Sequence, residues 1–221
     1  MYKTALIIGA TGLAGEQCLK QLLLAPEYNR VIALTRNPLT LTSGKFQNVV
    51  VDFDNLENYK QQLRADDIFC AIGTTIGKAG SQAAFKKVDF DIPLAVATTA
   101  GANGAERFIL VSSLGADAKS NVFYGRIKGQ LEEALAKLGY PALIIFRPSI
   151  LLGDRKEKRT GEEIGRFVAE KLSFIFSGPL KKYKGTPVDV LATAMIKSAN
   201  AGWIGTRIVE NEEIFVLAEN K

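Results

Sequence analysis

A glycine-rich turn between an apolar run and a helical pattern is the feature that most constrains this chain. The apolar residues 5–8 are followed directly by Gly9, Gly12 and Gly15. Because glycine lacks a Cβ, the backbone there can approach a phosphate and the following helix can pack against the strand. A turn without a ligand is the alternative, but amides at such a helix N-terminus bind pyrophosphate. The predicted cofactor contacts in this turn are Gly9, Thr11, Gly12, Leu13, Ala14 and Gly15.

The chain continues as an alternation of short β-rich runs and helical patterns. Short, continuously apolar runs are typical of parallel strands that are buried on both faces. The alternation therefore predicts an α/β fold with a doubly wound parallel sheet, a Rossmann fold. The expected strands cover residues 3–8, 31–34, 49–51, 68–72, 107–111 and 142–146, and the expected helices cover 13–24, 79–100 and 122–138. Pro93 should kink the second of these helices or mark a first turn.

The pattern becomes weaker after Pro148. A charged cluster at 154–159 reads as a loop, helices are expected at 162–174 and 188–200, and weak strands at 207–209 and 214–217. No repeat or low-complexity linker separates this part from the rest. We therefore expect one NAD(P)-binding domain over residues 1–221, in which 149–221 contribute a small substrate-side lid.

Composition excludes several classes of function. The chain has 221 residues, 47% of them hydrophobic, which is enough for one full core. The net charge of +5 is compatible with nucleic-acid binding or with an anionic cofactor and scattered lysines. The second interpretation is favoured, because no long basic run and no interleaving of basic and aromatic residues occurs.

The chain contains no histidine, which excludes Ser-His-Asp triads, Cys-His dyads and histidine metal sites. We expect no metal. Cys18 and Cys70 lie in apolar segments and read as reduced core thiols of an intracellular protein. No apolar stretch reaches the ~18 residues that span a bilayer, and the first apolar run ends too early for a secretion signal. The expected location is the cytoplasm.

The end of the second strand indicates which nicotinamide cofactor is used. An acidic residue there would bind the ribose 2′-hydroxyl of NAD, but this chain has Arg36, whose guanidinium suits the 2′-phosphate of NADP. A solvated loop arginine is the alternative. Asp52 ends the third strand and either contacts adenine or caps the next helix. Gly73, Thr74 and Thr75 follow the fourth strand and should lie beside the central part of the cofactor.

A tyrosine and a lysine four residues apart supply candidate acid–base chemistry. Tyr124 and Lys128 lie on one face of the helix that follows a strand ending in Ser112 and Ser113. A nearby ammonium favours the phenolate form of a tyrosine, which can exchange a proton with a carbonyl or alcohol while hydride moves. Ser112 or Ser113 would hydrogen-bond the reacting oxygen. The alternative is that Tyr124 and Lys128 are ordinary exposed helix residues.

With these residues in view, the chain resembles the atypical short-chain dehydrogenases/reductases. It is most similar to the Tat-interacting protein (CC3) oxidoreductase-like family and its bacterial relatives, over nearly the whole chain. The stretches that carry the resemblance are 51–53 (VDF), 69–75 (FCAIGTT), 77–80 (GKAG), 112–117 (SSLGAD), 146–148 (FRP) and 151–155 (LLGDR).

The resemblance implies NADP(H) binding through the glycine turn and Arg36, with Tyr124 as proton donor and Lys128 on the nicotinamide ribose. It also implies that Leu151 and Arg159 line the cofactor site, and Ser113 matches the catalytic serine position better than Ser112. One departure is the absence of the Asn-Asn-Ala-Gly segment, whose place is taken by residues around Gly73. A proton relay that depends on asparagine is therefore not expected.

The sequence thus predicts an NADP(H)-dependent oxidoreductase that acts on a small carbonyl or alcohol, as a monomer or homodimer. The resemblance does not supply the substrate. Animal members of the family are associated with regulation and a kinase activity, but the chain has no kinase catalytic-loop motif. A non-catalytic NADP(H)-binding sensor or scaffold is therefore the main alternative. A sugar epimerase or dehydratase is less favoured, because little chain remains for a sugar-nucleotide domain.

Overall fold

The computed structural model describes residues 2–153 and 184–219. Its centre is a seven-stranded sheet in the order β3-β2-β1-β4-β5-β6-β9, and every neighbouring pair of strands is parallel. The strands are β1 (Lys3–Ile8), β2 (Tyr28–Thr35), β3 (Phe46–Val50), β4 (Asp67–Cys70), β5 (Arg107–Val111), β6 (Ala142–Arg147) and β9 (Gly205–Glu210). The strand order reverses between β1 and β4, and ligands of such sheets bind outside the carboxyl ends of the strands at that point.

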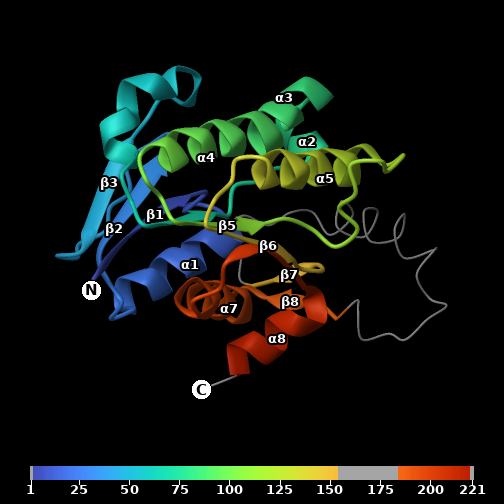
Figure 1. The fold of residues 1–221 in the computed structure, drawn as a ribbon. Coiled ribbons are helices and arrows are strands. Elements are labelled where there is room, and N and C mark those ends of the chain that lie inside the picture. Colours follow the sequence, from blue (N-terminus) through green and yellow to red (C-terminus); the bar gives the residue numbers. More distant parts are fainter. Residues whose placement is uncertain (1, 154–183, 220–221) are drawn as a thin grey trace.

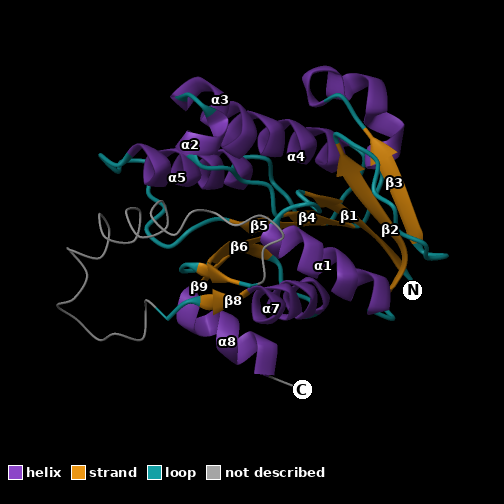
Figure 2. Ribbon diagram, turned by 180° about the vertical axis from the view of Figure 1, so that it is seen from behind, coloured by secondary structure: helices purple, strands orange, loops and turns teal. Residues whose placement is uncertain are grey.

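Helices cover both faces of this sheet (Figures 1 and 2). One face carries α2 (Ile76–Ala79), α3 (Gln82–Lys86), α4 (Ile92–Ala102) and α5 (Phe123–Ala136). The other carries α1 (Leu13–Leu24), α7 (Val188–Asn200) and α8 (Asn211–Glu219). The two short strands β7 (Leu151–Leu152) and β8 (Thr186–Pro187) pair with each other. The predicted doubly wound parallel fold is therefore confirmed.

Each face of the sheet has its own hydrophobic core. Along β1, Ala5 and Ile7 belong to the core beneath α1 and α7, while Leu6 and Ile8 belong to the core beneath α4 and α5. All of these side chains are fully buried. This burial on both sides explains why the strand is continuously apolar rather than alternating.

The segment 79–100, expected to be mostly helical, is helical except for a break at Gly80 and Ser81. Gly80 ends α2 in the left-handed conformation with φ of 82°, and the Ser81 hydroxyl then caps α3 by accepting the Ala84 N–H at 3.1 Å. A π-helical turn over Lys87–Asp91 leads into α4. Pro93 lies in the first turn of α4, directly after the π-helical turn, which agrees with one of the two expectations for this residue.

The predicted strand at 214–217 is wrong, because these residues lie in α8. Ile214 is fully buried, and Leu217 and Ala218, one turn later, pack against the same core. This spacing is that of a helix face. Glu212 and Glu213 in the first turn suit the positive end of the helix. The expected strand at 207–209 and helix at 188–200 are confirmed as β9 and α7.

Some expectations fall on residues 154–183, outside the described part of the chain. They are the charged loop at 154–159, the helix at 162–174 and the cofactor contact Arg159. The small substrate-side lid, expected over 149–221, also stays a prediction, and within that range β9 belongs to the central sheet and α7 packs on it. In the described part, no helix is both long and apolar enough to cross a bilayer. Nor do the described residues contain a group of three or more Cys, Asp or Glu side chains that could hold a metal ion.

Candidate functional site

The glycine turn brings the start of α1 against the ends of β1 and β4. Gly9 has φ of 84°, and a Cβ there would lie 2.5 Å from the backbone carbonyl carbon of Ala71. A Cβ on Gly15 would lie 2.0 Å from the Gly9 oxygen, so the helix touches the turn directly. Gly12 precedes α1 as its N-cap in an extended conformation. The first N–H groups of a helix have no acceptor within it, so those of α1 are available to an anion at the switch point of the sheet.

The loop after β2 carries Arg36 and is held by Asn48 from β3. The Asn48 amide donates to the Ala33 oxygen (3.0 Å) and to Thr35 Oγ1 (2.8 Å) and accepts the Leu39 N–H (2.7 Å). Arg36 itself is exposed. Asn48 is not among the residues predicted from the sequence. Its polar side chain directly before the apolar residues Val49 and Val50 is the signal that could have indicated it.

The Asp52 side chain forms a cap at the end of the third strand. It accepts the Asp54 N–H at 2.9 Å and the Asn55 amide at 2.7 Å, just before the 3₁₀-helical turns over Phe53–Leu63. The hydrogen bonds from Asn55 and Asp54 lower the pKa of this exposed carboxyl. Of the two alternatives, capping is confirmed, and a contact with adenine stays a prediction.

A buried ion pair lies next to the residues that follow β4. Lys128 Nζ lies 2.8 Å from Asp89 Oδ1, and the side chains are 4% and 0% exposed. The other carboxylate oxygen of Asp89 accepts the Thr74 N–H at 2.8 Å. A Cβ on Gly73 would lie 3.3 Å from Asp89 Oδ1 and 3.7 Å from Lys128 Nζ, so the pair borders this loop.

The charge of Lys128 is maintained by this contact. Burial alone would lower the pKa of the ammonium, but the Asp89 carboxylate outweighs burial and raises the pKa above its ordinary value. Sequence reasoning missed Asp89. Its partner Lys128 lies far along the chain, and the contact forms because the turn before α4 packs against α5.

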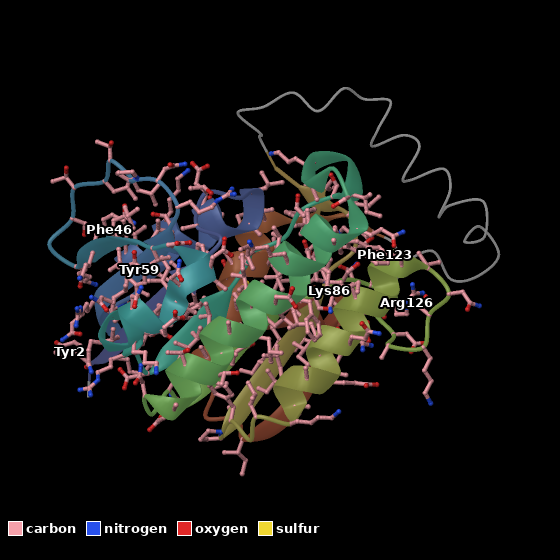
Figure 3. The ribbon with its side chains drawn as sticks, turned by 90° about the horizontal axis from the view of Figure 1, so that it is seen from above. Tyr2, Phe46, Tyr59, Lys86, Phe123 and Arg126 are labelled. Atoms are coloured by element: carbon pink, nitrogen blue, oxygen red, sulfur yellow. The ribbon has the colours of Figure 1, made fainter. Side chains whose placement is uncertain are left out.

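Tyr124 lies one helical turn before Lys128 on α5, and its electrostatic interaction also raises the pKa of Lys128. The half-buried Tyr124 ring packs against Phe85 with 5.7 Å between ring centroids, and Phe85 also contacts Phe123 at 5.5 Å. In Figure 3, which shows the molecule from above, Phe123 and Arg126 mark the start of α5, and Lys86 marks the end of α3. The aromatic contacts fix the orientation of the tyrosine ring.

The two candidate serines after β5 have different surroundings. Ser112 is buried and donates its hydroxyl to Glu132 Oε1 at 2.5 Å, while Glu132 is paired with Arg147 at 2.5 Å. Ser113 is half-buried and donates to the Leu114 oxygen at 3.1 Å. The Ser112 hydroxyl is therefore engaged in a buried polar network, whereas Ser113 is the more accessible of the two.

The predicted site residues thus follow successive strands at one edge of the sheet. The glycine turn follows β1, Arg36 follows β2, Asp52 follows β3, Gly73 to Thr75 follow β4 and the serines follow β5. Thr75 also caps α2 by accepting the Lys78 N–H at 3.3 Å. Leu151 lies in β7, half-buried. Carboxyl ends of parallel strands form the ligand-binding edge of such folds.

Comparison with known proteins shows the family of the chain. The family model described as NAD(P)H-binding matches residues 9–159, from the first glycine of the turn to beyond β7. The chain belongs to this NAD(P)H-binding family. Among its relatives, rat HTATIP2 is 35% identical over 225 residues, covering 99% of this chain and 90% of that protein. FMP52-1 of Scheffersomyces stipitis, called mitochondrial, is 37% identical over 193 residues, covering 85% of this chain and 80% of that protein. The expected resemblance to the Tat-interacting protein (CC3) family is confirmed.

Solved structures with the same fold are more distant in sequence. MoeE5 in complex with UDP-glucose and NAD has a TM-score of 0.71 at 16% identity, with 93% of this chain and 75% of that chain covered. UDP-glucose 4-epimerase from Thermotoga maritima with UDP-glucose has a TM-score of 0.71 at 17% identity, with 94% and 76% covered. At these identities the likeness establishes the Rossmann fold. The family match makes a nicotinamide dinucleotide the class of cofactor.

Proposed function

We propose that this member of the NAD(P)H-binding family is an NADP(H)-dependent oxidoreductase of the short-chain dehydrogenase/reductase type. It transfers hydride to or from a small carbonyl or alcohol, and Tyr124 is the proton donor. The observation that carries the proposal is the position of Tyr124 and Lys128. They lie one turn apart on α5, and Lys128 borders the Gly73 loop at the cofactor-binding edge of the sheet.

The residues at this edge fit the cofactor. The turn from Gly9 to Gly15, including Thr11, Leu13 and Ala14, would hold the pyrophosphate, because α1 begins there and Gly12 carries no side chain. Arg36 would hold the 2′-phosphate, and Lys128 the nicotinamide ribose. Further contacts are proposed for Asp52 at the adenine, for Gly73, Thr74 and Thr75 at the central part, and for Leu151 and Arg159. When bound, the nicotinamide supplies or accepts the hydride.

The chain's own groups would manage the proton. Tyr124 donates its phenolic proton to the carbonyl oxygen during reduction and accepts it back during oxidation. We assign the hydrogen bond to the reacting oxygen to Ser113, because the Ser112 hydroxyl is buried against Glu132. Phe85 keeps the Tyr124 ring in place, so the phenol does not have to be ordered when substrate binds.

The test is to replace Tyr124 and measure NADPH oxidation against a panel of carbonyls and quinones. Tyr124→Phe keeps the ring packing and removes the hydroxyl, so turnover should fall by the ~10²–10⁴-fold typical of lost general acid catalysis. Cofactor affinity should change little. Tyr59→Phe is the matched control, since Tyr59 is also half-buried but lies in the 3₁₀-helical turns after β3.

Three results would contradict the proposal. Full activity of Tyr124→Phe would show that Tyr124 is not the proton donor. Absence of turnover by the wild type with every substrate and both cofactors would favour an NADP(H)-binding sensor or scaffold. Turnover of a nucleotide sugar without net consumption of cofactor would instead favour an epimerase.

We also place the protein in the cytoplasm, as a monomer or homodimer acting on a small molecule. The name of the FMP52 relatives makes the mitochondrion the competing location. Fractionation of cells that express the chain, and size-exclusion chromatography with light scattering, test these two points.

A further inference from the structure

Asp89 connects three separate elements at the candidate site. It lies in the π-helical turn between α3 and α4 and is fully buried. One carboxylate oxygen is 2.8 Å from Lys128 Nζ on α5, and the other accepts the N–H of Thr74, in the loop after β4, at 2.8 Å. A single carboxylate therefore ties the proposed ribose-binding lysine to the loop beside which the cofactor would lie.

The surroundings of Lys128 make this carboxylate the compensating charge. The titratable groups that act on the ammonium are Asp89, Tyr124 on its own helix and Cys70 at the end of β4. Cys70 carries no charge to offer, since burial raises the pKa of its thiol to about 12. Glu132, one turn further along α5, is engaged with Ser112 and Arg147. A buried ammonium without a partner would give up its proton rather than remain charged.

We propose that Asp89 is a positioning residue that keeps the Lys128 ammonium charged and directed at the Gly73–Thr74 loop, where the cofactor ribose binds. The proposal rests on the proposed function, because it takes the ribose contact of Lys128 from it. It adds a carboxylate in a segment from which the sequence predicted no polar contribution to the site.

The variant Asp89→Asn separates charge from shape. The amide has nearly the size of the carboxylate and can still accept the Thr74 N–H, but it does not compensate an ammonium. Burial then lowers the pKa of Lys128 below its ordinary value, so that between pH 7 and 9.5 the side chain is protonated to a smaller extent than in the wild type. In the wild type the pKa of Lys128 is raised, and the ammonium stays charged over this whole range.

The first measurement is the stability of the cofactor-free protein against denaturant between pH 7 and 9.5. In Asp89→Asn the unfolded state binds more protons than the folded state once the pKa of Lys128 is lowered, so folding stability rises with pH. The variant should be less stable than the wild type at pH 7, and the difference in denaturation midpoint should narrow as pH increases. The double variant Asp89→Asn with Lys128→Met should show no such narrowing, because the titrating group is gone.

The second measurement is NADPH affinity by cofactor fluorescence over the same pH range. The NADPH dissociation constant of the wild type should change little with pH. That of Asp89→Asn should increase by up to about tenfold per pH unit above the lowered pKa of Lys128. Asp67→Asn is the matched control. Asp67 is also fully buried and ion-paired, with Lys3 and Arg107, but it begins β4 at the opposite edge of the sheet. This control should lose stability without acquiring a pH-dependent NADPH affinity.

The outcomes test the role of Asp89 separately from the proposed function. A stability difference that stays constant with pH would overturn the role of Asp89 in keeping Lys128 charged. If the stability difference between wild type and Asp89→Asn narrows with pH but the two proteins bind NADPH equally well, the role of Asp89 in positioning Lys128 for the cofactor would be overturned. Failure of the wild type to bind NADPH would overturn the proposed function, and the cofactor-free stability experiment would still judge the ion pair separately.

Discussion

Arg36 is the side chain on which the proposed preference for NADP(H) rests. It is exposed at the end of β2, where its charge is available to a 2′-phosphate. Titration by cofactor fluorescence should show that wild-type protein binds NADPH at least tenfold more tightly than NADH, since a charge-assisted contact contributes ~1.5–3 kcal/mol. Arg36→Ala should abolish the preference by weakening NADPH alone, and added salt should weaken NADPH binding more than NADH binding.

The control for this prediction is Arg30→Ala. Arg30 is an exposed arginine of the same strand whose guanidinium contacts Gln47, near the opposite end of β2. The Arg30→Ala variant loses the same net charge as Arg36→Ala, but at a distance from the proposed binding site of the 2′-phosphate. Equal affinities of the wild type for the two cofactors would contradict the role of Arg36.

Gly12 is predicted to leave space for the pyrophosphate. A Cβ at this position would already lie 3.3 Å from the Gly9 oxygen, and a branched side chain would extend into the space in front of α1. Gly12→Val should therefore lose NADPH binding while keeping the circular dichroism of the folded protein. Gly44→Val is the control, because a Cβ there has no atom within 4 Å. Normal NADPH binding by folded Gly12→Val would make the glycine turn purely structural.

At the scale of elements, β3 holds the loop that carries Arg36 through the side chain of Asn48. Its amide holds the Leu39 N–H and the Thr35 hydroxyl, so the loop that carries Arg36 is attached to the neighbouring strand. Asn48→Ala should cost ~1–3 kcal/mol of stability, because the Leu39 N–H loses its acceptor. NADPH affinity should fall severalfold while NADH affinity changes less. The measurement is the ratio of the two dissociation constants, and an unchanged ratio would separate the loop from cofactor choice.

The elements that could be predicted are those whose sequence signal is local. Runs of apolar residues predict the strands, and apolar residues at helical spacing predict α7. The positions where the strands end then predict the site residues that follow them. The segment 214–217 was misread because Ile, Phe and Val in succession favour a strand, while the buried face of α8 is decided by contacts with the core. Asp89 could not be predicted, because its contacts with Lys128 and Thr74 depend on how α5 and the loop after β4 meet.

At the scale of the whole molecule, both cysteines report on global opening. Cys18 and Cys70 are free thiols with no exposure, and burial raises the pKa of each. Ellman's reagent should therefore label the native protein only as fast as the protein opens, and should label both thiols rapidly in denaturant. A ligand that binds only the folded state at 100 times its dissociation constant stabilises it by ~2.7 kcal/mol. Saturation with NADPH to this level should slow labelling about a hundredfold, and rapid labelling of the native protein would contradict the burial of the thiols.

The order of the chain has a consequence for biosynthesis. The core beneath α1 is completed by Leu191 and Met195 of α7 and by Val209 of β9, and Gln21 of α1 contacts the Asp189 oxygen at 3.0 Å. During translation, the apolar face of α1 emerges from the ribosome roughly 170 residues before the segment that covers it. Leu19 and Leu22 therefore stay uncovered until residues 188–209 have been synthesised, an interval in which exposed apolar surface favours aggregation of the nascent chain.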